Sequence, residues 1–349
     1  MMGHLVSQFD PESLSPVRVT PSERGLPYGL TWVDLVPCLP GVDEARLDSC
    51  RALASYAKQG LNKGTNSCIV TLQYVVAGER CERTVFIKQT ADSAAWEAAN
   101  YRFLAAHGVP TPELLRAISR NRAEVLVLEF LPTIGVDFHA SRQIHDLLEL
   151  VARLSSVATE AYNPTAGHGT SRAAFDARVK AALTRVVLEP PGPVDADRWF
   201  QGYQIARDAL VAMPRAWSHG ELYFQQVGWS ARDGTPKLVM FDLATLARRP
   251  RFSDIATILP LLARESGERE LELFETYLAA LRQLTGLRPA VRQAARELRL
   301  TRVAGVCAAL PWLMEAVEHG EGFDLRSELL LKTRCLHDDL VALDMLDAA

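Results

Sequence analysis

The spacing of hydrophobic residues along this chain changes from a pattern typical of strands to one typical of helices. Residues 67–76 (SCIVTLQYVV) and 83–88 (RTVFIK) are rich in β-branched and aromatic side chains, and a polar turn at 77–80 (AGER) separates them. This pattern predicts a β-hairpin. Residues 124–131 (EVLVLEFL) form an apolar run that ends at Pro132, which predicts a buried strand.

Helical spacing begins with residues 94–107, which stop at Gly108, and it dominates from about residue 142 to 157 and again in several segments after 254. The second half of the chain is therefore expected to be mainly helical. Within residues 270–284 the apolar positions recur on one face, and we expect nearly all such leucines in the core. That face is formed by Leu271, Phe274, Leu278 and Leu281.

Residues 219–242 interrupt the helical pattern. Two short apolar strands are predicted there, at 226–229 and 238–241, around a turn at 232–234. Packing alone does not account for strands with polar ends inside a helical region. These polar ends are candidates for a functional site.

The length of 349 residues favours two domains or one unit with two lobes. Hydrophobic residues make up 48% and charged residues 23%, which is typical of soluble globular proteins. Residues 1–30 hold prolines, glycines and polar residues without sustained periodicity, so we expect an N-terminal leader that lies over the surface.

The charge balance and the cysteines exclude several classes of function. The net charge is −4 and no long run of Lys or Arg occurs, which argues against nucleic acid as the main ligand. The six cysteines are scattered and lack zinc-like spacing, so we expect reduced thiols. A secretory signal pattern is missing, and no apolar run approaches the roughly 20 residues that span a bilayer. We expect a cytoplasmic protein without a membrane partner.

Phosphoryl transfer needs backbone donors over the phosphates, a cation on their oxygens, magnesium ligands and a group that accepts the hydrogen of the nucleophile. Residues 60–67 (GLNKGTNS) form a small polar turn that suits the first role, although an ordinary hairpin entry also explains them. Lys88 ends an apolar strand, where its ammonium can reach phosphate. Glu97 in the next helix can hold that ammonium by an ion pair.

The most specific pattern is formed by residues 219–227 (HGELYFQQV), followed by Asp242 at the end of the next strand. This segment resembles the catalytic loop of the aminoglycoside phosphotransferase and choline kinase family. The family pattern reads His-Gly-Asp, four variable residues and Asn, with a metal-binding Asp one strand later. The resemblance covers about residues 50 to 260. It includes the 64–67 loop, the 85–88 strand, the helix of Glu97 with its 108–112 ending, the 128–132 hinge and Asp254-Ile255-Ala256.

The resemblance implies an α+β, bilobal, protein-kinase-like fold. A small N-lobe at 31–131, with an antiparallel sheet and one helix, would follow the leader at 1–30 and bind ATP. A larger, mainly helical C-lobe at 132–349 would carry the catalytic loop, the Mg2+ site and the helices that bind the acceptor. The implied reaction moves the γ-phosphate of ATP to a hydroxyl of a small molecule, such as an amino sugar, an aminoglycoside-like antibiotic, an amino alcohol or a sugar.

Carried over by position, the resemblance assigns a role to each matching residue. The 64–67 loop would cover the phosphates, Lys88 and Glu97 would align them, and the backbone from Glu129 to Leu131 would receive adenine. Glu221 takes the place of the catalytic Asp. The nucleotide-binding set is Gly64, Thr65, Asn66, Ser67, Lys88, Glu97, Glu129 and Leu131; the magnesium ligands are Gln226 and Asp242. His219 would tie the loop by hydrogen bonds.

Two departures from the family pattern lengthen a side chain by one methylene: Glu221 stands for Asp and Gln226 for Asn. Both keep the functional group, but a misplacement of about 1 Å can cost on the order of a hundredfold in rate. The alternative is therefore a catalytically weak or inactive kinase-like scaffold that binds nucleotide. Retention of Lys88, Glu97 and Asp242 argues against complete loss of function.

Three further interpretations stay open. A protein kinase ranks last, because neither a His-Arg-Asp nor an Ala-Pro-Glu signature occurs. Asp254 fits a helix cap or loop brace better than a metal ligand. Acidic residues of the helical half could bind a cationic acceptor, although their spacing also suits solvated helix faces. These are Glu265, Glu268, Glu315, Glu318 and Glu321. The sequence alone names neither the acceptor nor the oligomeric state.

Overall fold

The structure is a computed structural model. It describes residues 7–8, 16–19, 27–39, 46–53, 56–57, 65–76, 78–91, 97–120, 123–159, 162, 172–188, 192–232, 234–318 and 325–345. The chain forms two compact units. The first unit comprises Met1–Asp137 and Phe224–Ala244, and the second comprises Phe138–Tyr223 and Thr245–Ala349. The boundary between the two lobes that the sequence places at 131/132 stays a prediction.

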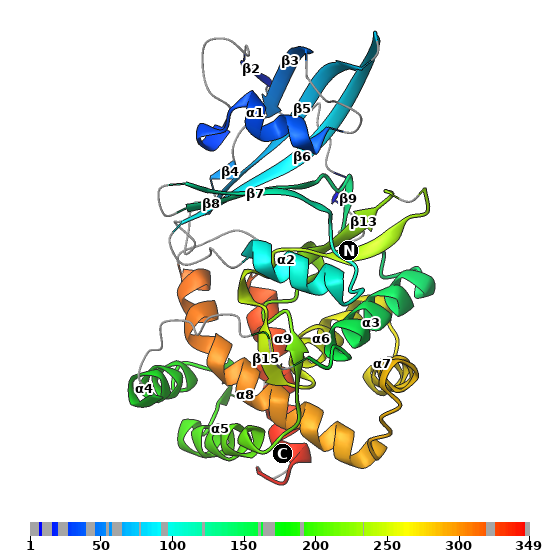
Figure 1. The fold of residues 1–349 in the computed structure, drawn as a ribbon. Helices are drawn as coiled ribbons and strands as arrows, with labels where there is room; N and C mark the ends of the chain where they lie inside the picture. Colours follow the sequence, from blue (N-terminus) through cyan, green and yellow to red (C-terminus); the bar gives the residue numbers. More distant parts are fainter. Residues whose placement is uncertain are drawn as a thin grey trace. The chain divides into compact units, whose positions relative to one another are not determined.

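An antiparallel sheet of seven strands dominates the first unit (Figure 1). Its order is β2-β3-β5-β6-β8-β7, with β4 paired to β5. The strands are β2 (Pro16–Val19), β3 (Arg46–Leu53), β4 (Tyr56–Ala57), β5 (Thr65–Val76), β6 (Glu79–Ala91), β7 (Leu114–Arg120) and β8 (Ala123–Glu129). The predicted hairpin is confirmed: β5 and β6 pair without a break from Thr65↔Thr90 to Val76↔Glu79. Gly78 has a φ of 88°, which glycine adopts at little cost in this tight connection.

One face of this sheet is covered by the segment that precedes it. The segment contains η2 (Pro27–Gly29), α1 (Trp32–Leu35) and η3 (Val36–Cys38). Alternate residues of the strands point toward it, as the period of a strand requires. The resulting core includes Leu30, Leu35, Cys38, Val70, Leu72, Val85, Ile87 and Val127.

Two short strands of the N-terminal part pair with segments far away in the sequence. The Pro16–Val19 strand β2 pairs with β3, and β1 (Ser7–Gln8) pairs with β9 (Thr133–Ile134). These strands were not predicted from the sequence, and the leader expected over 1–30 stays a prediction. Such short strands carry too little periodicity of their own, because their register is set by partners far away in the sequence.

Most of the mixed stretch that interrupts the helical half, from residue 224 on, belongs to the first unit. The predicted strands are β13 (Val227–Ser230) and β14 (Lys237–Met240), and they form a second sheet with the order β1-β9-β13-β14. Gly228 allows its two neighbouring segments to approach closely, since a Cβ there would lie 2.9 Å from Leu131 Cδ1 and 2.9 Å from Thr133 O. Helix α2 (Glu97–Ala106) also belongs to this unit and ends before Gly108, whose φ is 68°.

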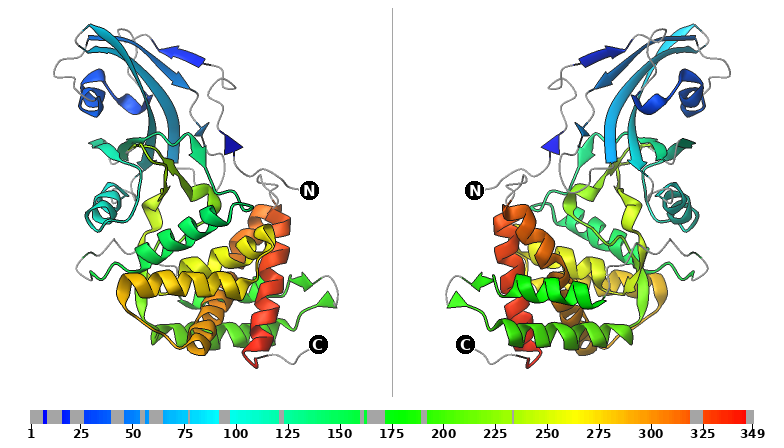
Figure 2. Two further views of the ribbon diagram at one scale, coloured as in Figure 1. Left: turned by 90° about the vertical axis from the view of Figure 1, so that its right-hand side faces the viewer. Right: turned by 90° about the vertical axis from the view of Figure 1, so that its left-hand side faces the viewer.

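The second unit is mainly helical, as predicted. Its helices are α3 (Ser141–Ser155), α4 (Arg172–Leu183), α5 (Ala196–Val211), α6 (Ser253–Ser266), α7 (Glu270–Thr285), α8 (Val291–Glu318) and α9 (Leu325–Ala342). Two pairs of short strands accompany them, β10 (Val187–Leu188) with β11 (Gly192–Pro193) and β12 (Arg215–Ser218) with β15 (Ala247–Pro250). Helix α8 packs against α4, α5, α6 and α9 (Figure 2).

The amino-acid composition of α8 is strongly apolar, as expected of a helix that packs against several others. Within the described part of the chain, it alone is long and apolar enough to cross a membrane, with a mean hydropathy of 1.3 over its most apolar window. However, 61% of that window is buried inside the protein. This burial is typical of the core helix of a helical unit.

The apolar face predicted for residues 270–284 is largely confirmed in α7. Phe274, Leu278 and Leu281 are buried, together with Tyr277, which completes the same stripe. Leu271 is 53% exposed, so its predicted place in the core was wrong. Leu273 and Phe274 in the same turn are buried, so Leu271 lies at the edge of the covered face of α7 and not within it.

A buried ion cluster joins three helices of the second unit. The Arg302 guanidinium on α8 donates to both carboxylate oxygens of Asp339 on α9, at 2.5 and 2.8 Å, and to Glu270 Oε1 on α7, at 2.6 Å. Arg302 and Asp339 are almost fully buried. Two charges in such a place are tolerated because each satisfies the other, so removal of one leaves the other uncompensated.

We expect Arg302→Met to lower the free energy of unfolding by about 3–5 kcal/mol, because Asp339 stays buried and keeps only the longer contact with Arg299 Nε, at 3.8 Å. The double variant Arg302→Met/Asp339→Leu should recover most of this loss. Denaturant unfolding measures both. The control is Arg178→Met, which breaks the exposed Arg178–Glu315 pair and should change stability by less than about 1 kcal/mol. Equal losses in Arg302→Met and Arg178→Met would contradict the interpretation.

Candidate active site

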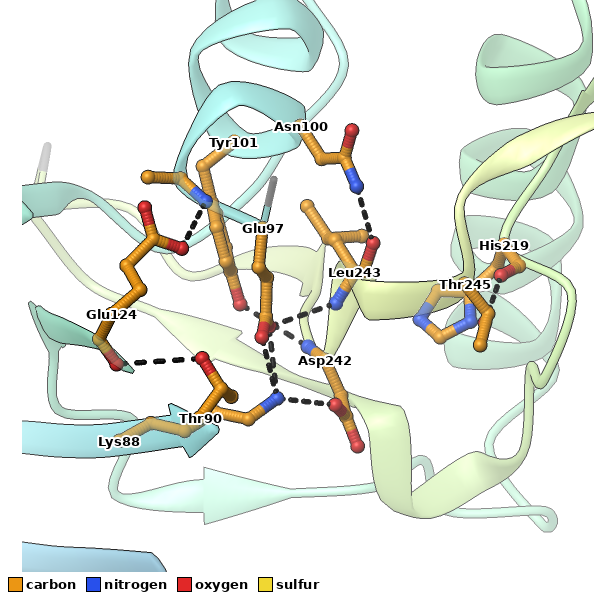
Figure 3. A network of polar contacts seen from close by, with 11 residues as sticks. Lys88, Thr90, Glu97, Asn100, Tyr101, Glu124, His219, Asp242, Leu243 and Thr245 are labelled. Carbon is orange, nitrogen blue, oxygen red and sulfur yellow. Dashed lines mark hydrogen bonds and ion pairs between the residues drawn. The ribbon is translucent and has the colours of Figure 1, made fainter. Parts of the chain in front are cut away.

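The centre of the candidate site is the ammonium of Lys88. Its strand β6 lies between β5 and β8, where Lys88 pairs with Ser67 and Leu126. The Nζ atom lies 2.9 Å from Glu97 Oε1, 2.8 Å from Glu97 Oε2 and 2.6 Å from Asp242 Oδ1 (Figure 3). The structure thus brings together three predicted site residues from β6, the start of α2 and the segment after β14.

Burial and charge decide the ionisation of this group. Burial alone would lower the pKa of Lys88, but the carboxylates of Glu97 and Asp242 outweigh it, and the net pKa is raised. Burial raises the pKa of Glu97, whereas Lys88 and the Leu243 N–H oppose that rise. Lys88 is therefore protonated at neutral pH, which is the state that binds phosphate oxygens.

Asp242 lies two residues after the end of β14 at Met240 and adopts an uncommon backbone conformation. Its φ is 63°, in the left-handed region that residues with a Cβ rarely occupy. Its side chain is 31% exposed. The carboxylate is thus partly open to solvent while one oxygen contacts the Lys88 ammonium.

Sequence reasoning missed several residues of α2 that contact the chain around Asp242. Tyr101 and Asn100 are buried polar residues whose side chains bind the backbone of residues 242 and 243. Glu124, also buried, accepts from the Ala98 N–H at 3.2 Å and so satisfies one donor at the start of α2. The sequence does contain one signal for these residues: the polar side chains at positions 97, 100 and 101 share one face of a helix, where they can bind a common partner.

Gln226 lies close to Asp242 along the paired strands β13 and β14. Its carbonyl accepts from the Phe241 N–H at 2.9 Å, directly before Asp242. No group of three or more His, Cys, Asp or Glu side chains that could hold a metal occurs among the described residues. A carboxylate and an amide nevertheless fit Mg2+, which typically takes one or two protein ligands and completes its shell with phosphates and water.

The first part of the predicted catalytic loop, residues 219–223, lies in the second unit and is braced by Asp254, whereas residues 224–227 belong to the first unit. This buried carboxylate on α6 accepts from Ser218 Oγ at 2.8 Å, from the His219 N–H at 2.8 Å and from the Gly220 N–H at 3.0 Å. The carbonyl of His219 accepts from Thr245 Oγ1 at 2.7 Å (Figure 3). Asp254 is thus a loop brace, and the backbone that precedes the exposed Glu221 is fixed by these bonds.

Gly220 is required by the shape of this loop. Its φ is 88°, and a Cβ there would lie 2.6 Å from Arg249 Nη2 and 2.9 Å from Thr245 O. Both the backbone conformation and the lack of space therefore favour glycine.

The predicted phosphate loop is only partly described. Gly64 lies outside the described residues. Thr65, Asn66 and Ser67 begin strand β5, where Asn66 and Ser67 pair with β4 as well as with β6. Their backbone groups thus lie in a three-stranded ladder, and their role at the phosphates stays a prediction.

The predicted adenine-binding backbone lies at the end of β8. The side chain of Glu129 accepts from Ser230 Oγ at 2.5 Å and from the Glu113 N–H at 3.1 Å, so it joins the end of β8 to β13 and to the residue before β7. Leu131 is buried against Gly228. Adenine binding there also stays a prediction.

Comparison with known proteins identifies the family. The sequence model of the phosphotransferase enzyme family matches residues 73–325, and the chain belongs to this family. The resemblance to aminoglycoside phosphotransferases and choline or ethanolamine kinases is confirmed. No curated protein sequence matches the chain.

Two solved structures illustrate the shared fold. An ethanolamine kinase of Plasmodium vivax is 10% identical, with a TM-score of 0.51 over 80% of this chain and 81% of that one. A thermostable mutant of the aminoglycoside phosphotransferase APH(4)-Ia, in a ternary complex with ADP and hygromycin B, is 14% identical, with a TM-score of 0.50 over 87% of this chain and 96% of that one. The predicted kinase-like α+β fold is confirmed.

Gly220→Ala should destabilise the second unit more than a glycine substitution with equal backbone strain. Gly267, at the end of α6, supplies the control, because its φ is 74° and a Cβ there meets nothing within 4 Å. Gly267→Ala should cost about 1–2 kcal/mol for the left-handed conformation. Gly220→Ala should cost about 1–3 kcal/mol more, because its Cβ overlaps Thr245 and Arg249. Denaturant unfolding compares the two, and equal costs would refute the close packing of this loop.

Lys88→Met should make stability depend on pH in a defined direction. Without the ammonium the pKa of Glu97, already raised by burial, rises further, so the folded state keeps this proton to a higher pH than the unfolded chain does. A group whose pKa is higher in the folded state than in the unfolded chain stabilises the folded state at low pH. This contribution is lost as the pH rises above the pKa of the unfolded chain, which is about 4.3 for Glu. The melting temperature of Lys88→Met should fall increasingly below that of the wild type between about pH 5 and pH 8.

The control for this pH dependence is the double variant Lys88→Met/Glu97→Gln, which has no carboxylate at position 97. Its deficit relative to the wild type should be nearly constant over the same pH range. A constant deficit in the single variant would show that Glu97 is not the group left uncompensated.

Proposed function

We propose that this protein transfers the γ-phosphate of ATP to a hydroxyl of a small molecule, with Mg2+ as the metal cofactor. The observation that carries this proposal is the buried contact of Lys88 with Glu97 and Asp242 in the first unit. Family membership supports phosphotransfer in general. The acceptor class and the metal belong to the proposal.

The three side chains suit the binding of a nucleotide triphosphate. Lys88 is protonated and held in one place by Glu97, so its ammonium can donate to phosphate oxygens without first being ordered. Phosphate oxygens would compete with Asp242 Oδ1 for this ammonium and leave the Asp242 carboxylate available to a metal. Asp242 and Gln226 would hold Mg2+, which when bound neutralises charge on the phosphate oxygens.

Glu221 takes the role of the general base by its place in the family pattern. Its carboxylate would accept the proton of the acceptor hydroxyl while the hydroxyl oxygen forms a bond to the γ-phosphorus. The bond from that phosphorus to the bridging oxygen breaks, and ADP leaves with the electron pair. The bonds from Asp254 to the loop fix the backbone before Glu221, so only the side chain has to adapt to the extra methylene.

Acceptors with both amino and hydroxyl groups are the first to test. The names of the two similar structures, an ethanolamine kinase and an enzyme complexed with hygromycin B, support this choice. The acidic residues considered for cation binding support it less, because several already pair with arginine. Glu265 pairs with Arg264, Glu315 with Arg178 and Glu318 with Arg185, whereas Glu321 lies outside the described residues.

We also place the reaction in the cytoplasm, where ATP is available. The cysteines whose side chains the structure describes are free thiols, in keeping with a reducing compartment.

The test combines Mg2+-dependent ATP binding with turnover. Thermal shift with ATP and Mg2+ is compared for the wild type, Asp242→Ala and the control Asp208→Ala, whose carboxylate pairs with Arg172 in the second unit. ADP release is then followed over a panel of amino sugars, amino alcohols and sugars. We expect stabilisation of the wild type and of Asp208→Ala, its loss in Asp242→Ala, and turnover with at least one acceptor.

The other outcomes separate the alternatives. Stabilisation without turnover on any acceptor would favour the catalytically inactive scaffold. The absence of any nucleotide response in the folded wild type would refute the proposal.

A further inference from the structure

Three polar side chains on one face of α2 bind the backbone of Asp242 and Leu243, shortly after β14 ends at Met240. The Tyr101 hydroxyl accepts from the Asp242 N–H at 3.1 Å, and Glu97 Oε1 accepts from the Leu243 N–H at 3.2 Å. The Asn100 side-chain amide donates to the Leu243 carbonyl at 2.8 Å. Figure 3 shows these bonds converging on the Asp242–Leu243 segment from a single helix.

The segment that they bind has a strained backbone. A left-handed φ at a residue with a Cβ costs of order 1–3 kcal/mol and persists only where the surroundings impose it. Asp242, with its φ of 63°, is such a residue. The bonds from α2 occupy the donor of residue 242 and both the donor and the acceptor of residue 243, so they supply that constraint.

The burial of these groups indicates that the contacts are specific. Tyr101 and Asn100 are each 1% exposed. A buried hydroxyl or amide is unfavourable unless it is hydrogen-bonded, and phenylalanine or leucine would fill such space without this requirement. The polar atoms are therefore explained by their bonds to the backbone around Asp242.

We propose that Tyr101 and Asn100 are positioning residues, which hold the Asp242–Leu243 backbone so that the Asp242 carboxylate is set in place for a magnesium–nucleotide complex. This inference rests on the proposed function. Neither side chain reaches the nucleotide; each acts through the conformation of residue 242. Glu97, also on α2, pairs with Lys88. Helix α2 therefore fixes both the Lys88 ammonium and the backbone that carries the Asp242 carboxylate.

The test uses Tyr101→Phe, which removes one oxygen atom and keeps the ring. The matched control is Tyr74→Phe on β5, where a tyrosine of the same unit is also buried, at 4% exposure, but lies in the core of the sheet. Asn100→Ala is the second variant and removes the other bond. For each protein two quantities are measured by calorimetry: the Mg2+ concentration that half-saturates binding in the presence of ATP, and the affinity for ATP in EDTA.

We expect the half-saturating Mg2+ concentration to rise about fivefold in Tyr101→Phe, which corresponds to the loss of one hydrogen bond. Asn100→Ala should change it in the same direction. ATP affinity in EDTA should stay at the wild-type value, and Tyr74→Phe should leave both quantities unchanged. In kinetics on an active acceptor, Tyr101→Phe should raise the Mg2+ requirement while kcat at saturating Mg2+ recovers.

Two results would overturn the inference. One is an unchanged Mg2+ requirement in folded Tyr101→Phe and Asn100→Ala. The other is an equal weakening of ATP binding with and without Mg2+, which indicates a structural role only. A wild type that binds ATP without any effect of Mg2+ would instead refute the proposed metal site itself. The measurements on the wild type and on Tyr74→Phe separate that outcome from a failure of the inference about Tyr101 and Asn100.

Discussion

The buried ammonium of Lys88 is the constraint on which the arrangement of the first unit depends. Removing an ammonium from water costs several kcal/mol, and only close carboxylates with satisfied hydrogen bonds offset that cost. Glu97 and Asp242 meet this requirement from segments that are far apart in the sequence. The sheet, α2 and the β13–β14 pair must therefore come together in one unit, and the division of the chain, in which residues 224–244 join the N-terminal part, follows from it.

The same helix that carries Glu97 also determines the backbone after β14. Its buried polar face binds residues 242 and 243, and Glu124 satisfies a donor at its start. In the second unit a comparable device holds the predicted catalytic loop, where Asp254 binds three consecutive residues. In each unit, buried side chains bind main-chain groups next to a carboxylate that solvent reaches: Asp242 in the first unit and Glu221 in the second. The backbone that carries this carboxylate therefore keeps a defined position although the carboxylate itself is not fully buried.

Local patterns in the sequence were sufficient for many of the elements, whereas the fold class came from the family resemblance. Periodicity predicts the β5–β6 hairpin, α2, α3, the helices after residue 254 and the two strands of the mixed stretch, because each buries one face. The pairing of β1 and β2 and the exposure of Leu271 could not be predicted, since both depend on which distant segment covers a residue. The residues of the Lys88 contact came from family resemblance, whereas Asn100 and Tyr101 were missed because buried polar residues on a helix resemble ordinary core positions until their partners are known.

The two departures from the family pattern can be judged against this arrangement. Glu221 belongs to the second unit and Gln226 to the first. The backbone at each position is fixed, by the Asp254 brace before Glu221 and by the Phe241 N–H bond to the Gln226 carbonyl. The extra methylene therefore changes how far the carboxylate and the amide reach and leaves their chemistry the same. In the proposed reaction, the reach of Glu221 sets the geometry of the transfer step, whereas the reach of Gln226 sets how its amide would meet Mg2+. The substitution at 221 therefore bears on the rate of transfer and the one at 226 on the Mg2+ requirement, while Lys88 stays held by its buried contacts with Glu97 and Asp242.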